Sequence, residues 1–447
     1  MKTKSKFTRL GLFDAKVPRY TSYPTAPHFS NRTGPDAASA WIKAIPQGSE
    51  ISLYVHIPFC RRLCWFCACR TQGTATASPV RAYLDTVLTE LRILADTLPA
   101  DVRLSRLHWG GGTPTLLDPD MITELAQAIA ETAPFADLYE FSVEIDPNEI
   151  DAPRVAALRA AGMTRASIGV QDFDPDIQSI IGRDQSFEIT ASTVEMLRAA
   201  GIESLNADIL FGLPNQTPQR MTSSVTKLLS LAPDRVALYG YAHVPWMARR
   251  QNLIPSDALP TPQERLVLFD VARKLFLWDG YDEVGIDHFA IPTDGLAQAR
   301  RSGTLRRNFQ GYTDDQSDVL IGVGASSISR FPQGYAQNQS ATSKYTAAIL
   351  RGELATARGH TFAGDDLLRA RMIEAIMCDF EIDVADMPGD PAVVRALLRS
   401  AHDAFDGTLV LRDDRLIVPP DARALTRMVA RHFDAYMVEE GRHASAI

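Results

Sequence analysis

The sequence has little of what a membrane-spanning or secreted protein needs. No stretch of its 447 residues approaches the roughly 18 consecutive apolar residues of a membrane-spanning helix. The basic start, residues 1–12, is not followed by an apolar run, so it does not resemble a secretory signal. We therefore predict a cytoplasmic protein without a membrane span.

An excess of positive charge is also missing. The chain has 46 Lys and Arg against 54 Asp and Glu, which gives a formal net charge of −8. Proteins that bind nucleic acids usually carry a basic surface, so this balance argues against a nucleic-acid partner. It is compatible with local basic pockets for an acidic small molecule. Hydrophobic content of 45% and charged content of 22% are typical of an ordinary globular protein.

Cysteine is scarce and unevenly distributed. Five cysteines are present, and four of them, Cys60, Cys64, Cys67 and Cys69, fall within ten residues. In a cytoplasmic chain, clustered thiols are more often metal ligands than disulfide partners. The fifth, Cys378, stands alone in an apolar stretch, and we predict that it is a buried core thiol.

Short β-branched and aromatic runs alternate with helical patterns over the middle of the chain. The predicted strands are residues 51–57, 104–109, 139–145, 165–170, 204–210 and 235–241. A capping residue followed by proline predicts helix starts at Ser78, Asp118, Thr217 and Thr261, and Gly201 fits a helix end. Six β–α units in a row imply right-handed crossovers and a parallel sheet. We therefore predict an α/β fold, a partial (β/α)6-type TIM barrel, with its chemistry at the carboxyl ends of the strands.

Two regions flank this barrel, which we expect to span residues 46–350. The N-terminal segment, residues 1–45, has no strong periodic pattern. From about residue 355 the pattern is helical, and we predict a mostly helical C-terminal domain over 355–447. Late in it, residues 408–411 and 416–418 could pair as a hairpin. This layout resembles a winged helix, but in an acidic chain we interpret it as a packing domain or lid.

The cysteine spacing C-x3-C-x2-C begins directly after the first predicted strand. Thiolates of Cys60, Cys64 and Cys67 can hold three irons of a [4Fe–4S] cubane, which leaves the fourth iron without a protein ligand. An open coordination site is what chemistry at the cluster requires. The alternative is a structural zinc site with Cys69 as fourth ligand. Zinc sites usually use two separated cysteine pairs, so the spacing favours the cluster.

The motif C-x3-C-x-aromatic-C after a first strand resembles the radical S-adenosylmethionine (SAM) superfamily. In that superfamily the open iron binds the amino and carboxylate groups of SAM, and an electron from the cluster cleaves SAM to methionine and a 5′-deoxyadenosyl radical. From about Pro18 to its end, the chain is similar to the oxygen-independent coproporphyrinogen III oxidase (coproporphyrinogen dehydrogenase) family. The segments that carry this resemblance are 18–26, Cys69, 108–115, 169–173, 308–312 and 335–339.

The resemblance implies roles for residues beyond the cysteines, and no catalytic residue outside the cofactor-binding set. Matches to positions around the cluster-bound SAM are Tyr54, Phe66, Gly111, Glu144 and Ile328. Matches to positions around a second SAM are Gly112, Thr113, Gln171, Arg183, Asp208 and Ala242. Without the resemblance, the glycines would indicate a tight turn, Glu144 a salt bridge within the barrel, and Arg183 a surface residue at a helix end. Phe66 and Ile328 alone would be interpreted as core.

The substrate that the resemblance implies is coproporphyrinogen III, a tetrapyrrole with four propionate arms. Two propionates would lose carbon dioxide and become vinyl groups, which gives protoporphyrinogen IX in haem biosynthesis without oxygen. The arms need cations, and Arg61, Arg62 and Arg70 are well placed in the sequence, with Arg19 as a weaker candidate. We also expect a monomer that receives electrons from a donor such as a flavodoxin or ferredoxin.

Two other functions remain open at this point. One is a haem-binding chaperone of the same superfamily, although such relatives typically lack the Cys69 extension and the segment 18–26. The other is a zinc-stabilised structural or interaction protein. Trp65 and Ala68 depart from the family pattern within the cysteine loop, but neither position supplies a ligand.

Overall fold

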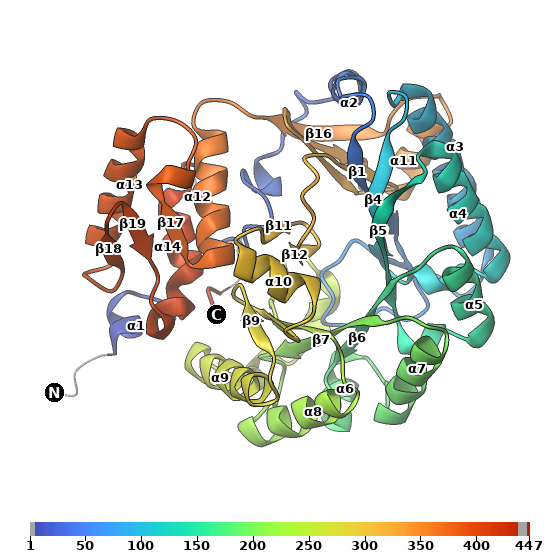
Figure 1. The fold of residues 1–447 in the computed structure, drawn as a ribbon. Helices are drawn as coiled ribbons and strands as arrows, with labels where there is room; N and C mark the ends of the chain where they lie inside the picture. Colours follow the sequence, from blue (N-terminus) through green and yellow to red (C-terminus); the bar gives the residue numbers. More distant parts are fainter. Residues whose placement is uncertain (1–4, 437–444) are drawn as a thin grey trace.

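A large twisted sheet organises the chain. The computed structural model describes residues 5–436 and 445–447, so residues 1–4 and 437–444 of the two predicted flanking regions lie outside it. At the centre of the sheet, strands run in the order β1-β4-β5-β6-β7-β8, with all neighbours parallel (Figure 1). These strands are β1 (Glu50–Ile57), β4 (Arg103–Gly111), β5 (Phe135–Ile145), β6 (Arg165–Gln171), β7 (Ser204–Phe211) and β8 (Arg235–Gly240). The predicted partial barrel is confirmed.

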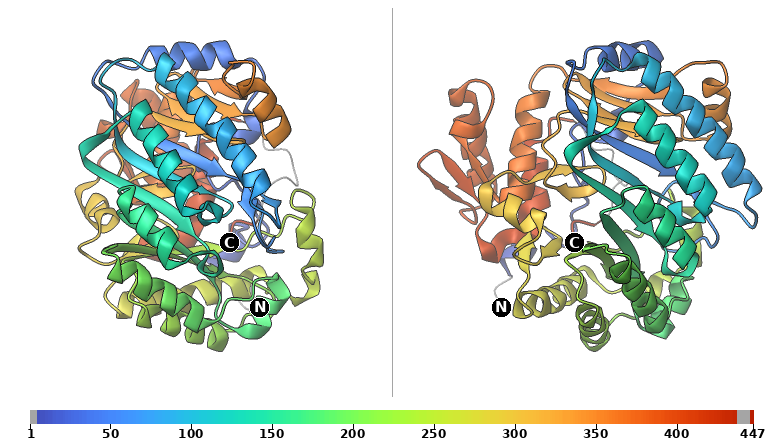
Figure 2. Two further views of the ribbon diagram at one scale, coloured as in Figure 1. Left: turned by 90° about the vertical axis from the view of Figure 1, so that its right-hand side faces the viewer. Right: turned by 45° about the vertical axis from the view of Figure 1, so that its right-hand side comes forward.

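Helices cover the outer face of these strands (Figure 2). They are α3 (Ser78–Thr97), α4 (Pro119–Thr132), α5 (Ala152–Ala160), α6 (Pro175–Ile181), α7 (Phe187–Ala199), α8 (Pro218–Ser230) and α9 (Pro262–Trp278). The predicted caps Asp118 and Thr217 accept from the third residue of their helices, and Thr261 forms a full capping box with Glu264. Ser78 instead is the first helical residue and makes no cap bond. No helix in the described ranges is long and apolar enough to cross a membrane.

The sheet extends beyond the six predicted strands on both sides. Next to β1 lie β13 (Leu320–Val323), β14 (Ile328–Phe331), β15 (Gly334–Asn338) and β16 (Thr356–Thr361); next to β8 lie β10 (His288–Ala290) and β9 (Asp282–Val284). Strand β13 pairs parallel with β1, whereas the other additions are antiparallel. Strand β16 lies where we expected the helical pattern to have begun, so that expectation is wrong for residues 356–361.

The C-terminal region packs three helices on a small sheet. It contains α12 (Asp366–Asp379), β17 (Glu381–Asp383), α13 (Pro391–Ala404), β18 (Val410–Arg412), β19 (Arg415–Ile417) and α14 (Thr426–Phe433). The predicted hairpin is present as the antiparallel pair β18–β19, and β17 adds a third strand. Cys378 is fully buried, as predicted. Leu12, Val17, Tyr20 and Tyr23 of the N-terminal segment belong to the main apolar core of the C-terminal region, and Arg19 donates to the main-chain oxygen of Gly240 at the end of β8. The segment therefore contacts both the C-terminal region and the barrel.

The chain also contains shorter helices and strands, beside several 3-10 helices. The shorter helices and strands are α1 (Lys6–Arg9), α2 (Pro35–Lys43), β2 (Phe59–Cys60), β3 (Gln72–Gly73), α10 (Gly295–Ser302), β11 (Arg306–Asn308), β12 (Gly311–Thr313) and α11 (Thr342–Ile349). Figure 1 shows α1 beside the C-terminal region, and α2 at the opposite end of the molecule.

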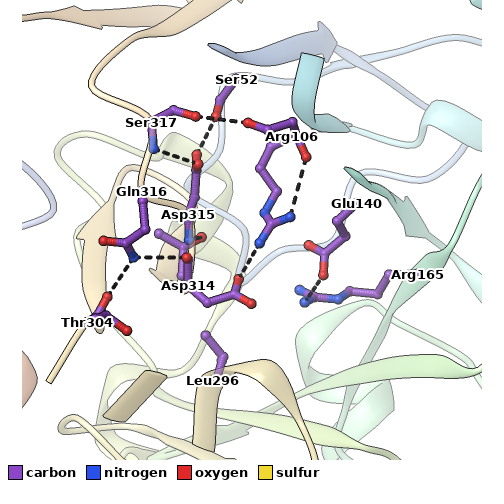
Figure 3. A network of polar contacts seen from close by, with 12 residues as sticks. Ser52, Arg106, Glu140, Arg165, Leu296, Thr304, Asp314, Asp315, Gln316 and Ser317 are labelled. Atoms are coloured by element: carbon purple, nitrogen blue, oxygen red, sulfur yellow. Dashed lines mark hydrogen bonds and ion pairs between the residues drawn. The ribbon is translucent and has the colours of Figure 1, made fainter. Parts of the chain in front are cut away.

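Polar contacts gather near the amino-terminal ends of the barrel strands (Figure 3). Arg106 of β4 pairs with Asp314, with 3.1 Å between Nη2 and Oδ1, and Arg165 of β6 pairs with Glu140 of β5. Ser52 of β1 donates to Asp315. Because these charges are paired with one another across strands and loops, they hold together the end of the barrel opposite the cysteines.

Candidate active site

A cavity of about 620 Å³ lies at the carboxyl ends of the parallel strands. All four clustered cysteines line it. The other predicted site residues in its wall are Phe66, Gly111, Gly112, Thr113, Glu144, Gln171, Arg183, Asp208 and Ala242. They come from β4, β5, β6, β7 and the loops that follow strands, which is the arrangement that a parallel barrel predicts for its functional face.

The cysteine loop is anchored where it passes the helix α6. Trp65 donates its main-chain N–H to the oxygen of Ile181 at 2.9 Å. Its indole packs on Gly182, where an added Cβ would lie 2.9 Å from the ring and where φ is +67°. Gly182 therefore has two reasons to be glycine: the left-handed backbone and the close approach of the indole. This contact holds the loop between Cys64 and Cys67 against the barrel.

All five cysteines, each within the described residues, are free thiols. Burial raises the pKa of Cys60 to about 11 and raises that of Cys64, which Arg183 partly opposes. The Cys69 thiol, assisted by the Cys69 main-chain N–H at 3.4 Å, lowers the pKa of Cys67 to about 6 against the effect of burial. Cys67 is thus the thiol that is readiest to ionise at neutral pH.

The donor set suits an iron–sulfur cluster. The four clustered cysteines supply sulfur, the donor that iron–sulfur clusters prefer, and the cationic side chains of Arg183 and Arg250 lower the pKa of Cys67. Among the described residues, no three Cys, His, Asp or Glu side chains converge on the position of a single ion. A [4Fe–4S] cubane does not require three ligands to converge on one ion, because each thiolate binds a different iron. Cys60, Cys64 and Cys67 therefore fit such a cluster.

The glycine loop after β4 is pinned to the strand that precedes the cysteines. Gly112 donates to the oxygen of Ile57 at 2.8 Å, and Thr113 donates to the oxygen of Phe59 at 2.7 Å. Gly111 has a φ of +109°, and an added Cβ would lie 2.4 Å from the His56 ring. The position therefore excludes any side chain. The backbone of the loop lies directly against the cavity as a result.

Glu144 presents an ionised carboxylate to the cavity. Oε2 accepts from the main-chain N–H of Gly111 at 3.0 Å, and Oε1 lies 3.3 Å from Nε2 of His108. Burial raises the pKa of Glu144, but these two contacts outweigh it and leave the pKa below its ordinary value. The side chain lies deep in the barrel, yet 41% of its surface is accessible, because that surface faces the cavity.

Arg183 is a buried residue beside the cysteines. Its Nη2 donates to the oxygen of Gly169 at 2.8 Å, while Nη1 lies 3.5 Å from Sγ of Cys64 and 3.4 Å from Oδ2 of Asp146. Burial lowers the pKa of Arg183, but Asp146 and Cys64 outweigh it and raise the pKa. The side chain is only 11% exposed, so the surface position suggested by its local sequence is wrong.

Asp208 lies on the cavity wall with one hydrogen-bond donor. Nδ2 of Asn206 donates to its Oδ1 at 2.9 Å. Burial, to which the charge of Glu144 adds, raises the pKa of Asp208 to about 7, against the opposing effect of the Asn206 bond. The carboxylate is therefore poised between its two protonation states near neutral pH, and a cationic ligand would favour the ionised form.

Two predicted cofactor residues do not line the cavity. The hydroxyl of Tyr54 lies 2.9 Å from Nδ1 of His56, and its ring stacks on His108. Ile328 lies on β14, outside the cavity wall. Their roles stay predictions.

Among the arginines expected to bind propionates, Arg19 and Arg62 line the cavity. Arg61 instead faces Glu149, with 3.8 Å between Nε and Oε2, and donates to the oxygen of Thr74. Arg70 is not part of the wall, and its main-chain oxygen lies 3.2 Å from the ring of His56. Proximity to the cysteines in sequence made Arg19 a weaker candidate than Arg61 and Arg70, but of these three arginines Arg19 is the one that lines the cavity.

Several residues of the site were missed. Gln251 is fully buried and donates to the main-chain oxygens of Phe66 and Ala242. Arg250 lines the cavity and donates from Nη2 to Thr71 at 2.9 Å. Both lie in a short 3-10 helix (Arg249–Leu253) of the segment that follows β8, and nothing in the local sequence distinguishes them. Arg307 also lines the cavity. The sequence could have pointed to this residue, because the segment 308–312, which carries part of the family resemblance, begins directly after it.

Comparison with known proteins identifies the family. Residues 54–228 match the family model described as the radical SAM superfamily. The chain is 59% identical to the oxygen-independent coproporphyrinogen III oxidase of Paracoccus denitrificans, with full coverage of both chains, and 36% identical to that of Escherichia coli over 95% of this chain and 94% of the relative. The solved structure of the Escherichia coli enzyme, described as a radical SAM enzyme, superposes with a TM-score of 0.89 at 35% identity, over 95% of this chain and all of that one. The chain belongs to the oxygen-independent coproporphyrinogen III oxidases of the radical SAM superfamily.

Proposed function

We propose that this protein converts two propionate arms of coproporphyrinogen III to vinyl groups and so forms protoporphyrinogen IX in haem biosynthesis without oxygen. The observation that carries the proposal is the single cavity in which four thiols, the glycine loop, the carboxylates of Glu144 and Asp208 and several arginines meet. Its relatives extend over the full length of the chain, including the N-terminal segment and the C-terminal region.

The cysteines Cys60, Cys64 and Cys67 would hold the [4Fe–4S] cluster that the superfamily uses. When bound, the reduced cluster would supply the one electron that cleaves SAM, and the carbon-centred radical so formed would remove a hydrogen atom from a propionate β-carbon, whose C–H bond acid–base catalysis does not open. For each arm, the substrate then loses carbon dioxide and one electron, which passes to an acceptor. The protein contributes binding, orientation and the exclusion of water.

The chain's own polar groups would orient the cofactor. The ionised carboxylate of Glu144 has the charge and the position to accept hydrogen bonds from hydroxyl groups, such as those of the SAM ribose. The backbone of Gly111 approaches the cavity without a side chain in the way. Arg183 and Asp208 carry opposite charges on the same wall, which suits the carboxylate and the amino group of a second SAM.

The remaining partners follow from the same chemistry. Reduction of the cluster requires a one-electron donor such as a flavodoxin or ferredoxin. Free clustered thiols require a reducing compartment, so we place the enzyme in the cytoplasm. We propose that it acts as a monomer.

An anaerobic assay tests the proposed function. The purified protein, reconstituted with iron and sulfide, is incubated with dithionite, SAM and coproporphyrinogen III, and the products are oxidised and separated. We expect a product that has lost two carboxyl groups, formed with two molecules of carbon dioxide. Intact substrate, with a cluster that nevertheless cleaves SAM, would overturn the assignment.

A further inference from the structure

A second cavity, of about 270 Å³, adjoins the active-site cavity. The two share the residues Arg19, Gly240, Tyr241, Asp287 and Arg307 in their walls. The junction therefore lies where the N-terminal segment meets the end of β8 and the strand β11. Nothing in the cofactor chemistry described above uses these residues.

Arg19 presents its guanidinium group to this junction. Within the described residues its side chain makes one hydrogen bond, from Nη2 to the main-chain oxygen of Gly240 at 2.6 Å. The residue lies deep in the protein and yet keeps exposed surface, because its side chain stands in the cavity wall. Burial lowers its pKa, and Asp287 opposes this effect. Arg19 thus has further guanidinium donors without a hydrogen-bond partner among the described residues, in the wall that the two cavities share.

Arg307 adds a second positive charge at the same place. Its side chain is 5% exposed, and its Nε and Nη1 find no hydrogen-bond partner among the described residues. Oδ1 of Asp287 lies 3.9 Å from Nη1, beyond hydrogen-bond distance, and the guanidinium lies over the ring of Tyr312. Buried guanidinium donors without partners are costly, so this arrangement points to an anion that would offset their charge.

At the junction itself, positive charge exceeds negative charge, because the shared residues include Arg19 and Arg307 but only Asp287 as a carboxylate. Arg265 and Arg427 also line the second cavity, and burial lowers their pKa to about 10 and about 9. Arg427 is held by main-chain oxygens, including those of Val17 and Pro18, and not by a carboxylate. Burial raises the pKa of Asp287, but Arg307 and its other neighbours outweigh it, so Asp287 is ionised. Among the five residues that both cavities share, Asp287 is the one carboxylate beside two guanidinium groups. The second cavity is also lined by Asp270, Glu283 and Asp421, of which Glu283 pairs with Arg273 and Arg423, and Asp421 pairs with Lys6.

We propose that the junction binds a carboxylate of a propionate arm that is not reacting, with Arg19 as the direct contact and Arg307 as a positioning charge behind it. This inference rests on the proposed function. The four arms of the tetrapyrrole are spread around a ring, so when one arm reaches the cysteines, another must extend away from them. The carboxylate of such an arm is an anion that a planar guanidinium recognises by paired hydrogen bonds.

Substitution of each arginine, with a matched control, tests the inference. The variants are Arg19→Gln, Arg307→Gln and the conservative Arg19→Lys; the control is Arg306→Gln. Arg306 lies next to Arg307 on β11, but its Nε pairs with Glu374 at 3.0 Å and it lines neither cavity. In the reconstituted enzyme, KM and kcat for coproporphyrinogen III are measured beside the cleavage of SAM by dithionite without substrate.

We expect Arg19→Gln to raise KM about ten- to a hundredfold, as the loss of a charged hydrogen bond does, and Arg307→Gln to raise it about tenfold. Arg19→Lys should recover part of the loss. SAM cleavage should be unchanged in all variants, and the KM of Arg306→Gln should stay within about twofold of that of the wild type. An unchanged KM in Arg19→Gln would overturn the inference, as would a matching fall in SAM cleavage.

A binding experiment remains decisive even if a variant folds poorly. The probes are coproporphyrin III and its tetramethyl ester, titrated against the wild-type holoenzyme by fluorescence. The acid should bind at least about tenfold more tightly than the uncharged ester. Equal affinities would overturn the inference. A wild type that does not decarboxylate coproporphyrinogen III contradicts the proposed function instead, whereas a wild type that does so, with variants of unchanged KM, contradicts only this binding site.

Discussion

The side-chain amide of Gln251 donates to the main-chain oxygen of Phe66 across 2.7 Å. The same Nε2 donates to Ala242 at 3.0 Å, and Oε1 accepts from the N–H of Val244. One buried amide thus ties the cysteine loop to the loop that follows β8. Since both loops line the active-site cavity, the geometry of the site depends on a residue that touches neither thiol nor carboxylate.

Replacement of Gln251 with leucine should loosen the cysteine loop. The change leaves two main-chain oxygens and one N–H buried without partners, at a cost of about 1–3 kcal/mol for each group that water does not reach. We expect a lower Tm and less iron per chain after reconstitution. Gln298→Leu is the matched control, because this exposed amide also donates to a main-chain oxygen, that of Thr293. Equal iron content in the two variants would show that the hydrogen bonds of Gln251 do not hold the cysteine loop in place.

Replacement of Cys64 with alanine should abolish the cluster and turnover. A cubane held by two thiolates has lost a ligand from one iron, and no other thiol of the loop has been assigned to that position. Iron content, the visible absorbance of the anaerobic protein and product formation report the outcome. Cys378→Ala should keep all three, because Cys378 is buried in the core beside Tyr312, away from the cavity wall. A Cys64→Ala enzyme with full activity would end this account of the site.

The pH dependence of SAM binding should reflect Asp208. Its pKa is raised to about 7, so the carboxyl group is neutral below that pH and ionised above it. A ligand ammonium group binds the ionised form, so affinity should fall about tenfold for each pH unit below 7 and level off above it. Calorimetric titration with SAM measures the affinity as a function of pH. A range of about pH 5.5 to 8.5 extends roughly one and a half units to each side of the pKa of Asp208. Asp208→Asn should bind more weakly and without this slope; an unchanged slope would assign it to another group.

An alanine at position 111 should disrupt the site in two ways. The new Cβ would lie 2.4 Å from the His56 ring, and φ of +109° is unfavourable for any residue with a side chain. The loop would have to move from the cavity, and the bond from Gly111 to Glu144 would be lost with it. Gly352→Ala separates the two effects, because its φ is +76° but an added Cβ meets nothing within 4 Å. We expect SAM affinity to fall at least about tenfold in Gly111→Ala alone.

Local sequence patterns predicted the central elements well. The six parallel strands and the caps Asp118, Thr217 and Thr261 lie where apolar runs and capping signals placed them, since these signals act over a few residues. The strands β13 to β16 were missed, because strands of four to six residues give no sustained period. Their place in the sheet depends on the pairing of β13 with β1, which lies far away in the sequence, and on the pairing of β14, β15 and β16 in turn with β13, β14 and β15.

The candidate site was predictable where a motif or the family resemblance carried it. The cysteine spacing, the three glycines after β4 and the matched positions Glu144, Arg183, Asp208 and Ala242 led to the cavity, but other residues of its wall were not predicted. Arg19 lies on the cavity wall because the N-terminal segment packs with the C-terminal region, and no local pattern reports such a contact. Conversely, Arg61 and Arg70 are near the cysteines in sequence, but their side chains are not part of the wall.

Glu90 supplies a prediction about the fold itself. This buried carboxylate on α3 accepts from the hydroxyl of Tyr345 at 2.6 Å, the N–H of Gly324 at 2.7 Å and Nδ2 of Asn338 at 2.7 Å. It thereby joins the helix to the residue that follows β13, to β15 and to α11. Burial raises its pKa above the ordinary value, although the three donors oppose this. Glu90→Gln replaces one acceptor oxygen with a donor, which leaves a buried group unpaired and should cost about 1–3 kcal/mol of stability.

The sign of the pH effect follows from the direction of the pKa shift. A carboxyl group whose pKa is higher in the folded state contributes stability at low pH and loses it as pH rises through the folded pKa. The wild type should therefore exceed Glu90→Gln in unfolding free energy by more at about pH 5 than at about pH 8. The lower value is close to the ordinary pKa of a carboxyl group. Urea denaturation at both pH values measures the difference, with the exposed Glu353→Gln as control. A difference that grows with pH would show that Glu90 is held ionised, with a folded pKa below its ordinary value.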